Sequence, residues 1–379
     1  MIKKKAAFIY SADLEEYQYP ADHPFNTHRA KRLRVALHSM GMLAGPNSIE
    51  APPVVAEREV LEKFHSHHYL NALQTATAGH WDVEALGMGI GTSDCPVFEG
   101  LYEYSSLAAG ATMVGVDLLL SGKADIAFNP SGGQHHAGPE KASGFCYIND
   151  VALACTVLAE RGKRVLYLDV DVHHGDGVAY GFYDRPDVMT ISMHQDPRTL
   201  FPGTGFEDEI GEGAGKGYCV NIPVPVGTYD QAYMKAFEAV VLPLAGAFNP
   251  DIIVFELGTD ALAGDPLANL RLTNNVYAAI INHLLKFDKP ILATGGGGYN
   301  IENTVRAWAL AWSVFCGEDQ AHDAIHALGG VMLGSMEWLG GLRDREIAVT
   351  DFQQSLIMPA LDLTIDKIKK RVFSIHGLC

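Results

Sequence analysis

Three observations predict an α/β fold with a central, mostly parallel sheet covered by helices on both faces. Short apolar runs typical of buried strands recur along the chain, at residues 6–10, 126–128, 165–170, 188–194, 252–257 and 291–294. Longer helical patterns lie between several of these runs, an alternation that favours parallel strands in a three-layer α/β/α arrangement. Polar residues suited to chemistry stand next to the carboxyl ends of the strands, where open α/β sheets bind ligands.

The helical patterns have recognisable ends. The three clearest cover residues 102–121, 149–161 and 273–287. Asn149 and Thr273 are candidate N-caps, because their side chains can accept hydrogen bonds from N–H groups of the first turn. Gly122 and Gly162 follow two of the ends, where glycine adopts the left-handed conformation that terminates a helix. No repeat, low-complexity tract or linker divides residues 1–379, so a single domain is expected.

Composition and charge limit the classes of function. Hydrophobic residues make up 48% of the chain and charged residues 19%, which fits a globular protein with a large core and not a disordered chain. The formal net charge of −17 argues against direct nucleic-acid binding, since the basic clusters are all short. An acidic surface can attract a cationic substrate such as a lysine-rich peptide or a polyamine, although it can equally serve solubility alone.

Cysteine usage and hydropathy favour a cytoplasmic protein. The six cysteines are scattered and form no C-x-x-C pair, so neither a disulfide framework nor a cysteine zinc site is expected. The apolar stretch after the N-terminal lysines is too short for a signal peptide, and no run approaches the ~18 apolar residues of a membrane span. We therefore expect a reduced protein without membrane association.

The segment at residues 168–177, Leu-Asp-Val-Asp-Val-His-His-Gly-Asp-Gly, is the strongest single indication of a site. If the preceding strand continues through it, Asp169, Asp171 and His173 share one face, because residues i, i+2 and i+4 point the same way. Carboxylate oxygen and imidazole nitrogen suit a catalytic zinc that takes further ligands from elsewhere. The alternative is that acidic and histidine residues simply end the strand in a solvated loop.

Other polar residues accompany the other predicted strands and are expected at the same edge of the sheet. They are His135, His136, His194, Asp260, and Tyr299 after the glycines 295–298. Asp171 and His173 supply two zinc ligands on this interpretation, and Asp260 is the natural third. Two carboxylates and one imidazole leave a position open for water and substrate. Taken alone, Asp260 could equally cap the turn that follows it.

His135 and His136 suit acid–base chemistry. Amide hydrolysis needs a base that takes a proton from water and an acid that protonates the leaving amine, and histidine can do both near neutral pH. Asp169 and Asp176 remain after the metal ligands are assigned. Each could accept an N–H from one imidazole, which would fix the tautomer and raise the basicity of the ring. Taken alone, a His-His pair is more often part of a surface loop.

The four glycines at residues 295–298 resemble a phosphate loop only superficially, because they lack the G-x-G-x-x-G and G-K-[ST] patterns. A better use for them is to let the backbone turn sharply, so that the Tyr299 hydroxyl points into the site. A phenol donor at that position would stabilise a developing oxyanion.

In combination, these segments resemble the zinc-dependent histone deacetylase family, including its bacterial acetoin-utilisation-type and class I-like members. The matching motifs lie at residues 23–24, 28–29, 94–96, 135–136, 144–146, 169–176, 201–205, 258–260 and 295–299. The resemblance covers most of the chain and implies the arginase/deacetylase-like α/β fold, with the active site at the carboxyl ends of the strands. The related arginases use two manganese ions, which would need carboxylates in place of His135 and His136.

The resemblance implies a role for each matching residue. The implied ligands of Zn²⁺, or of Fe²⁺ in the cell, are Asp171, His173 and Asp260. His136 would act as general base and then as general acid, and Asp176 would orient it. His135, paired with Asp169, would assist electrostatically. Tyr299 would bind the acetyl carbonyl oxygen.

Further implied positions bind the substrate and a monovalent cation. Phe145 and Phe201 would form the walls of a narrow channel around an acyl-lysine stem, with Gly144 at its floor. Without the resemblance, both phenylalanines would more simply be core residues. Asp94 at the rim would accept backbone N–H groups of a peptide substrate. The residues implied for a structural K⁺ or Na⁺ are Asp169 and Ser192.

Two residues near the channel depart from particular branches of the family. Leu267 stands where polyamine-specific relatives carry a glutamate, and Pro266 stands where corepressor-bound nuclear enzymes carry an arginine for inositol phosphate. We therefore expect a zinc-dependent amidohydrolase that removes acetyl groups from lysine side chains of proteins or peptides. The alternatives are an acetylpolyamine or small-molecule amide deacetylase, and a non-catalytic module that binds acyl-lysine. Glu256 has no assigned role, and the sequence carries no indication of the oligomeric state.

Overall fold

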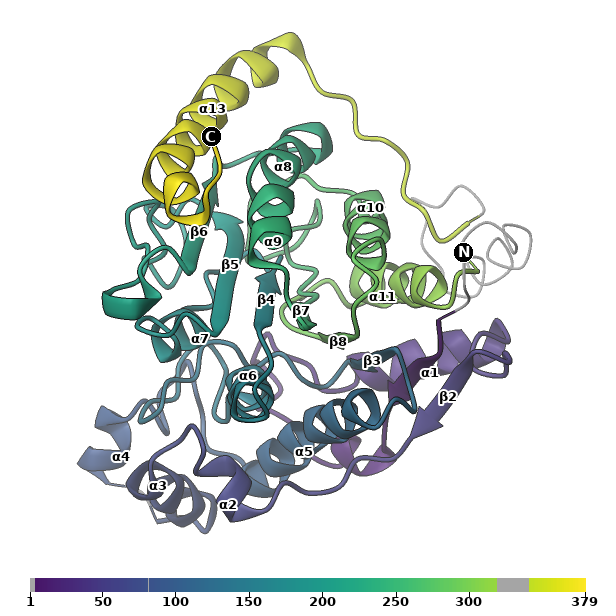
Figure 1. Ribbon diagram of the computed structural model, residues 1–379. Coiled ribbons are helices and arrows are strands. Elements are labelled where there is room, and N and C mark those ends of the chain that lie inside the picture. Colours follow the sequence, from purple (N-terminus) through teal and green to yellow (C-terminus); the bar gives the residue numbers. More distant parts are fainter. Residues whose placement is uncertain (1–3, 81, 319–340) are drawn as a thin grey trace.

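Eight strands form one sheet in the part of the chain that the structure describes (Figure 1). This computed structural model describes residues 4–80, 82–318 and 341–379. The strands are β1 (Ala6–Ile9), β2 (Ser48–Ala51), β3 (Ile126–Asn129), β4 (Val165–Asp169), β5 (Val188–Gln195), β6 (Cys219–Val224), β7 (Ile252–Glu256) and β8 (Ile291–Thr294). Their order across the sheet is β2-β1-β3-β8-β7-β4-β5-β6, and every neighbouring pair runs parallel. The predicted α/β class is confirmed.

The sequence predicts six of these strands to within a residue at each end, but it does not predict the two edge strands, β2 and β6. Both lack a continuous apolar run. β2 carries Ser48 and Glu50 on a partly exposed edge. β6 contains Asn221 and Pro223, and a proline is tolerated in a sheet mainly on an edge strand, where its missing N–H removes no ladder bond.

Twelve α-helices surround the sheet in the described ranges. They are α1 (Arg29–Ser39), α2 (Arg58–Leu61), α3 (His67–Thr77), α4 (Val83–Gly87), α5 (Leu101–Leu120), α6 (Asp150–Glu160), α7 (Asp176–Gly181), α8 (Asp230–Ala236), α9 (Leu242–Phe248), α10 (Asn274–Leu285), α11 (Ile301–Phe315) and α13 (Asp351–Val372). A π-helical turn, Phe237–Val241, joins α8 to α9. Within these ranges no helix combines the length and the apolar character that crossing a bilayer requires.

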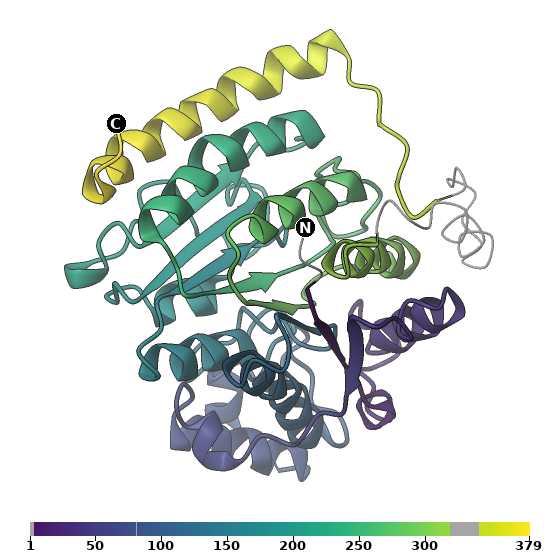
Figure 2. The same cartoon turned by 45° about the vertical axis from the view of Figure 1, so that its right-hand side comes forward.

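Successive strand residues point to opposite faces of the sheet, and each face packs against its own set of helices. In β1, Ala6 and Phe8 belong to a core shared with α1, α8, α9, α10, α11 and α13. Ala7 and Ile9 belong to the opposite core, which is shared with α5, α6 and α7. Figure 2 shows the green and yellow helices on one side of the sheet and the blue helices on the other. The strands are therefore buried on both faces, as their apolar runs predict.

The predicted helix ends are confirmed with one exception. The Asn149 side chain accepts the Ala152 N–H at 2.8 Å and caps α6. Gly122 and Gly162 have φ of +65° and +72°, the left-handed conformation expected after a helix. Thr273 occupies the N-cap position of α10 but makes no capping bond with its side chain. Its hydroxyl and its N–H donate to the Asp230 carboxylate instead.

Candidate active site

The polar residues singled out in the sequence lie at the carboxyl ends of β3, β8, β7, β4 and β5, which are consecutive neighbours in the sheet. From β4 the chain continues to β5 and β6 on one side, whereas β7 and β8 lie on the other side. This reversal of strand order is a topological switch point, where α/β sheets bind ligands. Asp171 and His173 follow β4, and Asp260 follows β7, so these residues flank the switch point.

The segment after β4 is a loop and not a continuing strand. β4 ends at Asp169, so the prediction that Asp171 and His173 share a strand face with it is wrong. Two hydrogen bonds shape the loop instead. The Asp171 N–H donates to Asp169 Oδ1 at 3.0 Å, and the His173 N–H donates to Asp171 Oδ1 at 2.9 Å. Aspartate commonly forms such turns by accepting a bond from the backbone two residues on.

Asp171, His173 and Asp260 form a buried carboxylate–imidazole cluster. His173 Nδ1 lies 3.1 Å from Asp171 Oδ1 and 3.0 Å from Asp260 Oδ2. Burial opposes the charged form of His173, yet the carboxylates of Asp260 and Asp171 raise its pKa to about 10. Burial, together with the neighbouring charge of Asp171, raises the pKa of Asp260 to about 7. Two acids therefore share one imidazole, and the negative charge of the cluster is not fully balanced.

This cluster fits a divalent metal ion. Its three ligand atoms lie within 4.8 Å of one another, close enough for one ion to contact all of them. Glycines make room for the carboxylates: a Cβ on Gly297 would lie 1.9 Å from Asp260 Oδ2, and one on Gly258 would lie 2.0 Å from Asp171 Oδ2. Two carboxylates and an imidazole suit divalent ions such as Zn²⁺ and Fe²⁺. The positive charge of such an ion would balance the acids.

His135 and His136 lie next to the cluster, and each has its own carboxylate partner. His135 Nδ1 lies 2.9 Å from Asp169 Oδ2, and His136 Nδ1 lies 2.7 Å from Asp176 Oδ1. Both Nδ1 atoms therefore donate, since an ionised carboxylate can only accept. The two Nε2 atoms face each other at 3.0 Å, a separation that forms a hydrogen bond only when one of them carries a proton.

The charges around the two imidazoles differ. Burial opposes protonation of His135, but the carboxylates of Asp169 and Glu256 raise its pKa well above the usual value. Burial and the adjacent charge of His135 lower the pKa of His136, and Asp176 opposes this shift only in part. The proton between the two Nε2 atoms therefore resides on His135. His136 Nε2 retains the lone pair that can accept a proton.

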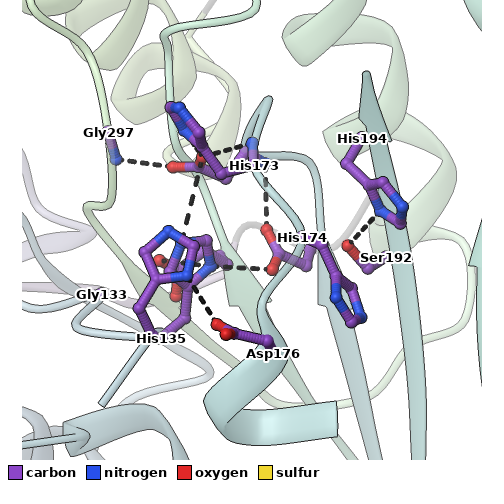
Figure 3. A network of polar contacts seen from close by, with 12 residues as sticks. Gly133, His135, His173, His174, Asp176, Ser192, His194 and Gly297 are labelled. Carbon is purple, nitrogen blue, oxygen red and sulfur yellow. Dashed lines mark hydrogen bonds and ion pairs between the residues drawn. The ribbon is translucent and has the colours of Figure 1, made fainter. Parts of the chain in front are cut away.

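The glycine run after β8 contacts the cluster directly. The Gly297 N–H donates to Asp171 Oδ2 at 2.6 Å, and Figure 3 shows this N–H directed at the carboxylate beside His173. Gly296 and Gly298 have φ of +124° and +132°, values that glycine adopts without steric cost. Tyr299 follows this backbone turn, and its ring centroid lies 6.5 Å from that of His173.

Two phenylalanines lie on different sides of the reactive groups. The Phe145 ring packs edge-on against Tyr299, with ring centroids 5.8 Å apart. The Phe201 ring packs edge-on against His136 at 5.1 Å and is 44% exposed. Phe145 is half-buried, and neither ring lies wholly in the core. The two rings therefore pack against two different residues of the site, Tyr299 and His136.

A small cavity reaches the cluster, and neither Phe145 nor Phe201 belongs to the lining that the described residues form. Its lining includes His135, His136, Gly144, Asp171, His173 and Tyr299. A Cβ on Gly144 would lie 2.2 Å from the His136 ring, so the backbone itself forms the wall there. Asp94 Oδ2 accepts the Gly144 N–H at 2.7 Å, which ties this half-buried carboxylate to the cavity wall. Leu267 lies outside the cavity lining that the described residues form.

The prediction that His194 adds a reactive group at this edge is wrong. His194 lies within β5, and its Nε2–H donates to the Gly205 carbonyl at 2.8 Å. Its Nδ1 lies 2.9 Å from Ser192 Oγ, a pair that stands apart from His135 in Figure 3. Burial lowers the pKa of His194 to about 4, so the ring is neutral. It supports the loop after β5, and Ser192 lies opposite Asp169 in the strand register.

Arg29 contacts the site but had no assigned role in the sequence. Its Nη1 donates to the Gly298 carbonyl at 2.9 Å, and the guanidinium lies over the rings of Phe25 and Trp308. It is 4% exposed, although it belongs to a run of basic residues that resembles a surface cluster. The only sequence signal was the His-Arg motif at residues 28–29, which carries no indication of this partner.

Glu256 also contacts the site. Its Oε2 accepts the Thr294 hydroxyl at 3.0 Å, and its Oε1 lies 3.6 Å from His135 Nδ1. Among the described residues, Oε1 has no hydrogen-bond partner. Burial raises the pKa of Glu256 well above the usual value, and the charge of His135 opposes this shift. The sequence signal was an acid inside an apolar strand, but the partner lies on a distant segment.

The fold and the site define an α/β protein with a buried carboxylate–imidazole centre at a switch point of a parallel sheet. The family model described as the histone deacetylase domain matches residues 23–315. This match covers more than half of the chain, and the chain therefore belongs to the histone deacetylase family, as its motifs predict.

Individual relatives agree with this membership. The chain is 39% identical to histone deacetylase RPD3 of Saccharomyces cerevisiae over 311 residues, which cover 81% of this chain and 71% of that protein. It is also 39% identical to the acetoin utilization protein AcuC of Bacillus subtilis over 328 residues, or 84% of each. The crystal structure of an HDAC homolog complexed with SAHA superposes with a TM-score of 0.87 at 32% identity, covering 97% of this chain and 100% of that chain.

Proposed function

We propose that the protein is a metal-dependent deacetylase that removes acetyl groups from lysine side chains of proteins or peptides. The observation that carries this proposal is the pairing of a carboxylate–imidazole metal cluster with two histidines of opposite pKa shift around one cavity. Family membership supports the deacetylase class, and the family match over residues 23–315 supports one catalytic domain. The assignment of each residue below is part of the proposal.

Asp171, His173 and Asp260 would bind the metal, Zn²⁺ or in the cell Fe²⁺. When bound, such an ion supplies Lewis-acid chemistry, because it lowers the pKa of water and polarises a carbonyl group. The Gly297 N–H bond to Asp171 holds one ligand in place. We further propose that Asp169 and Ser192, opposite each other in neighbouring strands, contribute to a structural K⁺ or Na⁺ site.

His136 serves as the base and then as the acid. Its Nε2 takes a proton from the attacking water and later delivers it to the lysine nitrogen as the amide C–N bond breaks. Asp176 accepts the Nδ1–H and fixes the tautomer that leaves Nε2 unprotonated. His135, held in its charged form beside Asp169, stabilises negative charge that develops on the substrate.

The channel residues select the substrate. Phe145 and Phe201 would contact the methylene stem of an acyl-lysine. The Gly144 backbone, which has no side chain, would leave room for this stem beside His136. Asp94 uses one carboxylate oxygen to hold Gly144, while the described residues donate no hydrogen bond to the other oxygen. That second oxygen would accept backbone N–H groups of a peptide. Leu267 adds no charge that would favour the second ammonium group of a polyamine.

A substrate panel tests this function. Acetyl-lysine peptides, longer acyl-lysine peptides, acetylpolyamines and small acetylamides are compared by kcat/KM with the metal-loaded protein. We expect acetyl-lysine peptides to be the best substrates, because Asp94 and the aromatic channel match a peptide and its lysine stem. A higher kcat/KM for acetylpolyamines would replace the proposal with a polyamine deacetylase. Binding of acetyl-lysine peptides without turnover would indicate a recognition module.

Tyr299→Phe is expected to lower kcat by roughly 10²–10³-fold, the scale for the loss of one oxyanion donor. Tyr299 lines the cavity, and its hydroxyl would donate to the acetyl carbonyl oxygen as that oxygen becomes negative. Single-turnover and steady-state kinetics with an acetyl-lysine peptide measure the effect. Tyr69→Phe is the matched control, since it removes a buried tyrosine hydroxyl bonded to the Tyr147 carbonyl, away from the cavity. Unchanged turnover of Tyr299→Phe would exclude this role.

A further inference from the structure

The carboxylate of Asp265 connects two segments that border the site. Its Oδ2 accepts the Tyr299 N–H at 2.8 Å, and its Oδ1 accepts the Leu267 N–H at 2.9 Å. The residue is 8% exposed, and its own N–H donates to the Leu262 carbonyl at 3.2 Å. One buried side chain therefore bridges the loop after β7 and the glycine run after β8.

The chemistry of these contacts explains why a carboxylate occupies the position. Both partners are backbone N–H donors, and hydrogen bonds to an ionised acceptor are about twice as strong as neutral ones. Asn300 caps α11, so Asp265 also lies just before the N-terminus of a 15-residue helix, where negative charge is favourable. An amide at residue 265 would keep only one accepting oxygen and would direct its NH₂ group at a second donor.

The bond to Tyr299 matters because the preceding backbone has unusual freedom. Gly298 has φ of +132°, and a run of glycines can adopt many other conformations. The Gly298 carbonyl is fixed by Arg29, and α11 begins at Ile301. Between these two anchors, the N–H of Tyr299 itself is held by Asp265. The position of the Tyr299 ring beside the cavity therefore depends on this carboxylate.

We infer that Asp265 is a positioning residue that holds the Tyr299 hydroxyl at the reacting carbonyl and couples it to the backbone at Leu267. The inference rests on the proposed function, in which Tyr299 contacts the substrate. A displacement of about 1 Å in a reacting group lowers the rate by roughly 10²-fold, so a residue that never contacts the substrate can govern turnover. Because Asp265 acts through Tyr299, its effect should vanish once the Tyr299 hydroxyl is absent.

A double-mutant cycle tests the dependence on Tyr299. Asp265→Asn is expected to lower kcat by roughly 10–10²-fold, while KM changes little, because the substrate contacts remain. In the Tyr299→Phe background, the same substitution should lower kcat by less than about twofold. A role in general stability would reduce kcat by the same factor in both backgrounds, and that result would overturn the inference. If Asp265→Asn does not fold, Asp265→Ser, whose hydroxyl can still accept one N–H, replaces it in the cycle.

Hydrogen–deuterium exchange supplies a readout that does not depend on activity. In Asp265→Asn the Tyr299 amide should exchange about tenfold faster or more, the scale for losing a bond to a charged acceptor. Asp230→Asn is the matched control, because Asp230 accepts the Thr273 N–H at 2.8 Å beside α10, away from Tyr299. Unchanged exchange at Tyr299 would overturn the inference. A wild-type protein without deacetylase activity would refute the proposed function, whereas the exchange rates would still decide whether Asp265 holds Tyr299.

Discussion

His136→Ala is expected to lower kcat by roughly 10²–10⁴-fold, the usual range for losing a general acid–base group. His135→Ala should lower it by less. His136 has the lowered pKa and the unprotonated Nε2, so it both accepts and returns the proton. His135 is kept charged by Asp169 and Glu256, and it contributes charge to the site without changing its protonation state. Steady-state kcat with a saturating acetyl-lysine peptide measures both variants.

His283→Ala is a suitable control for this pair, because His283 is half-buried on α10 beside Glu238, outside the cavity. It should retain wild-type turnover. The order of the two losses is the decisive result. A larger loss for His135→Ala than for His136→Ala would assign the base to the other ring. It would also mean that the proton between the two Nε2 atoms resides on His136.

Asp171→Ala is expected to abolish metal binding and to reduce turnover to background. Groups that only orient a metal ligand contribute about 10–100-fold to affinity, so the loss of a ligand should weaken binding further. In the wild-type protein, added Zn²⁺ should raise Tm, because an ion that binds only the folded state stabilises it by about 4 kcal/mol at roughly 1,000 times Kd. Elemental analysis after dialysis and thermal unfolding with Zn²⁺ measure both effects.

Asp208→Ala serves as the control for Asp171→Ala, since Asp208 is an exposed aspartate outside the cluster. It should keep the metal content, the rise in Tm and the activity of the wild-type protein. Full metal content in Asp171→Ala would show that the ion is held elsewhere. A second group of three candidate ligands, which contains His135, Asp171 and Glu256, would still lose a member in this variant. Both groups are therefore tested by the same substitution.

Local patterns in the sequence predict most of the architecture. Buried parallel strands such as β4 and β7 are continuous apolar runs, and helix ends such as Asn149 and Gly162 depend on neighbours a few residues away. The sequence does not predict the edge strands β2 and β6, because a strand that pairs on one side only tolerates polar residues or a proline. The change from strand to loop at Asp169 is also missed, because alternating polar residues are compatible with either conformation.

The sequence predicts which residue types form the candidate site, but not the contacts that hold these residues in place. Motifs identify the groups that line the cavity, since carboxylates, histidines and a tyrosine have recognisable chemistry. The residues that position these groups act through contacts between distant segments. Arg29 reaches the carbonyl of Gly298, and Asp265 reaches the N–H of Tyr299. No local pattern links such pairs, and an arginine among other basic residues or an aspartate in a turn has a simpler explanation.

The turns after β4 have a consequence for how the site can vary. Asp169 and Asp176 hold the two histidines, while Asp171 and His173 belong to the cluster between them in the chain. An insertion or deletion of one residue in this loop would therefore shift both sets of groups relative to each other. The length of this loop thus constrains the site together with its residue types.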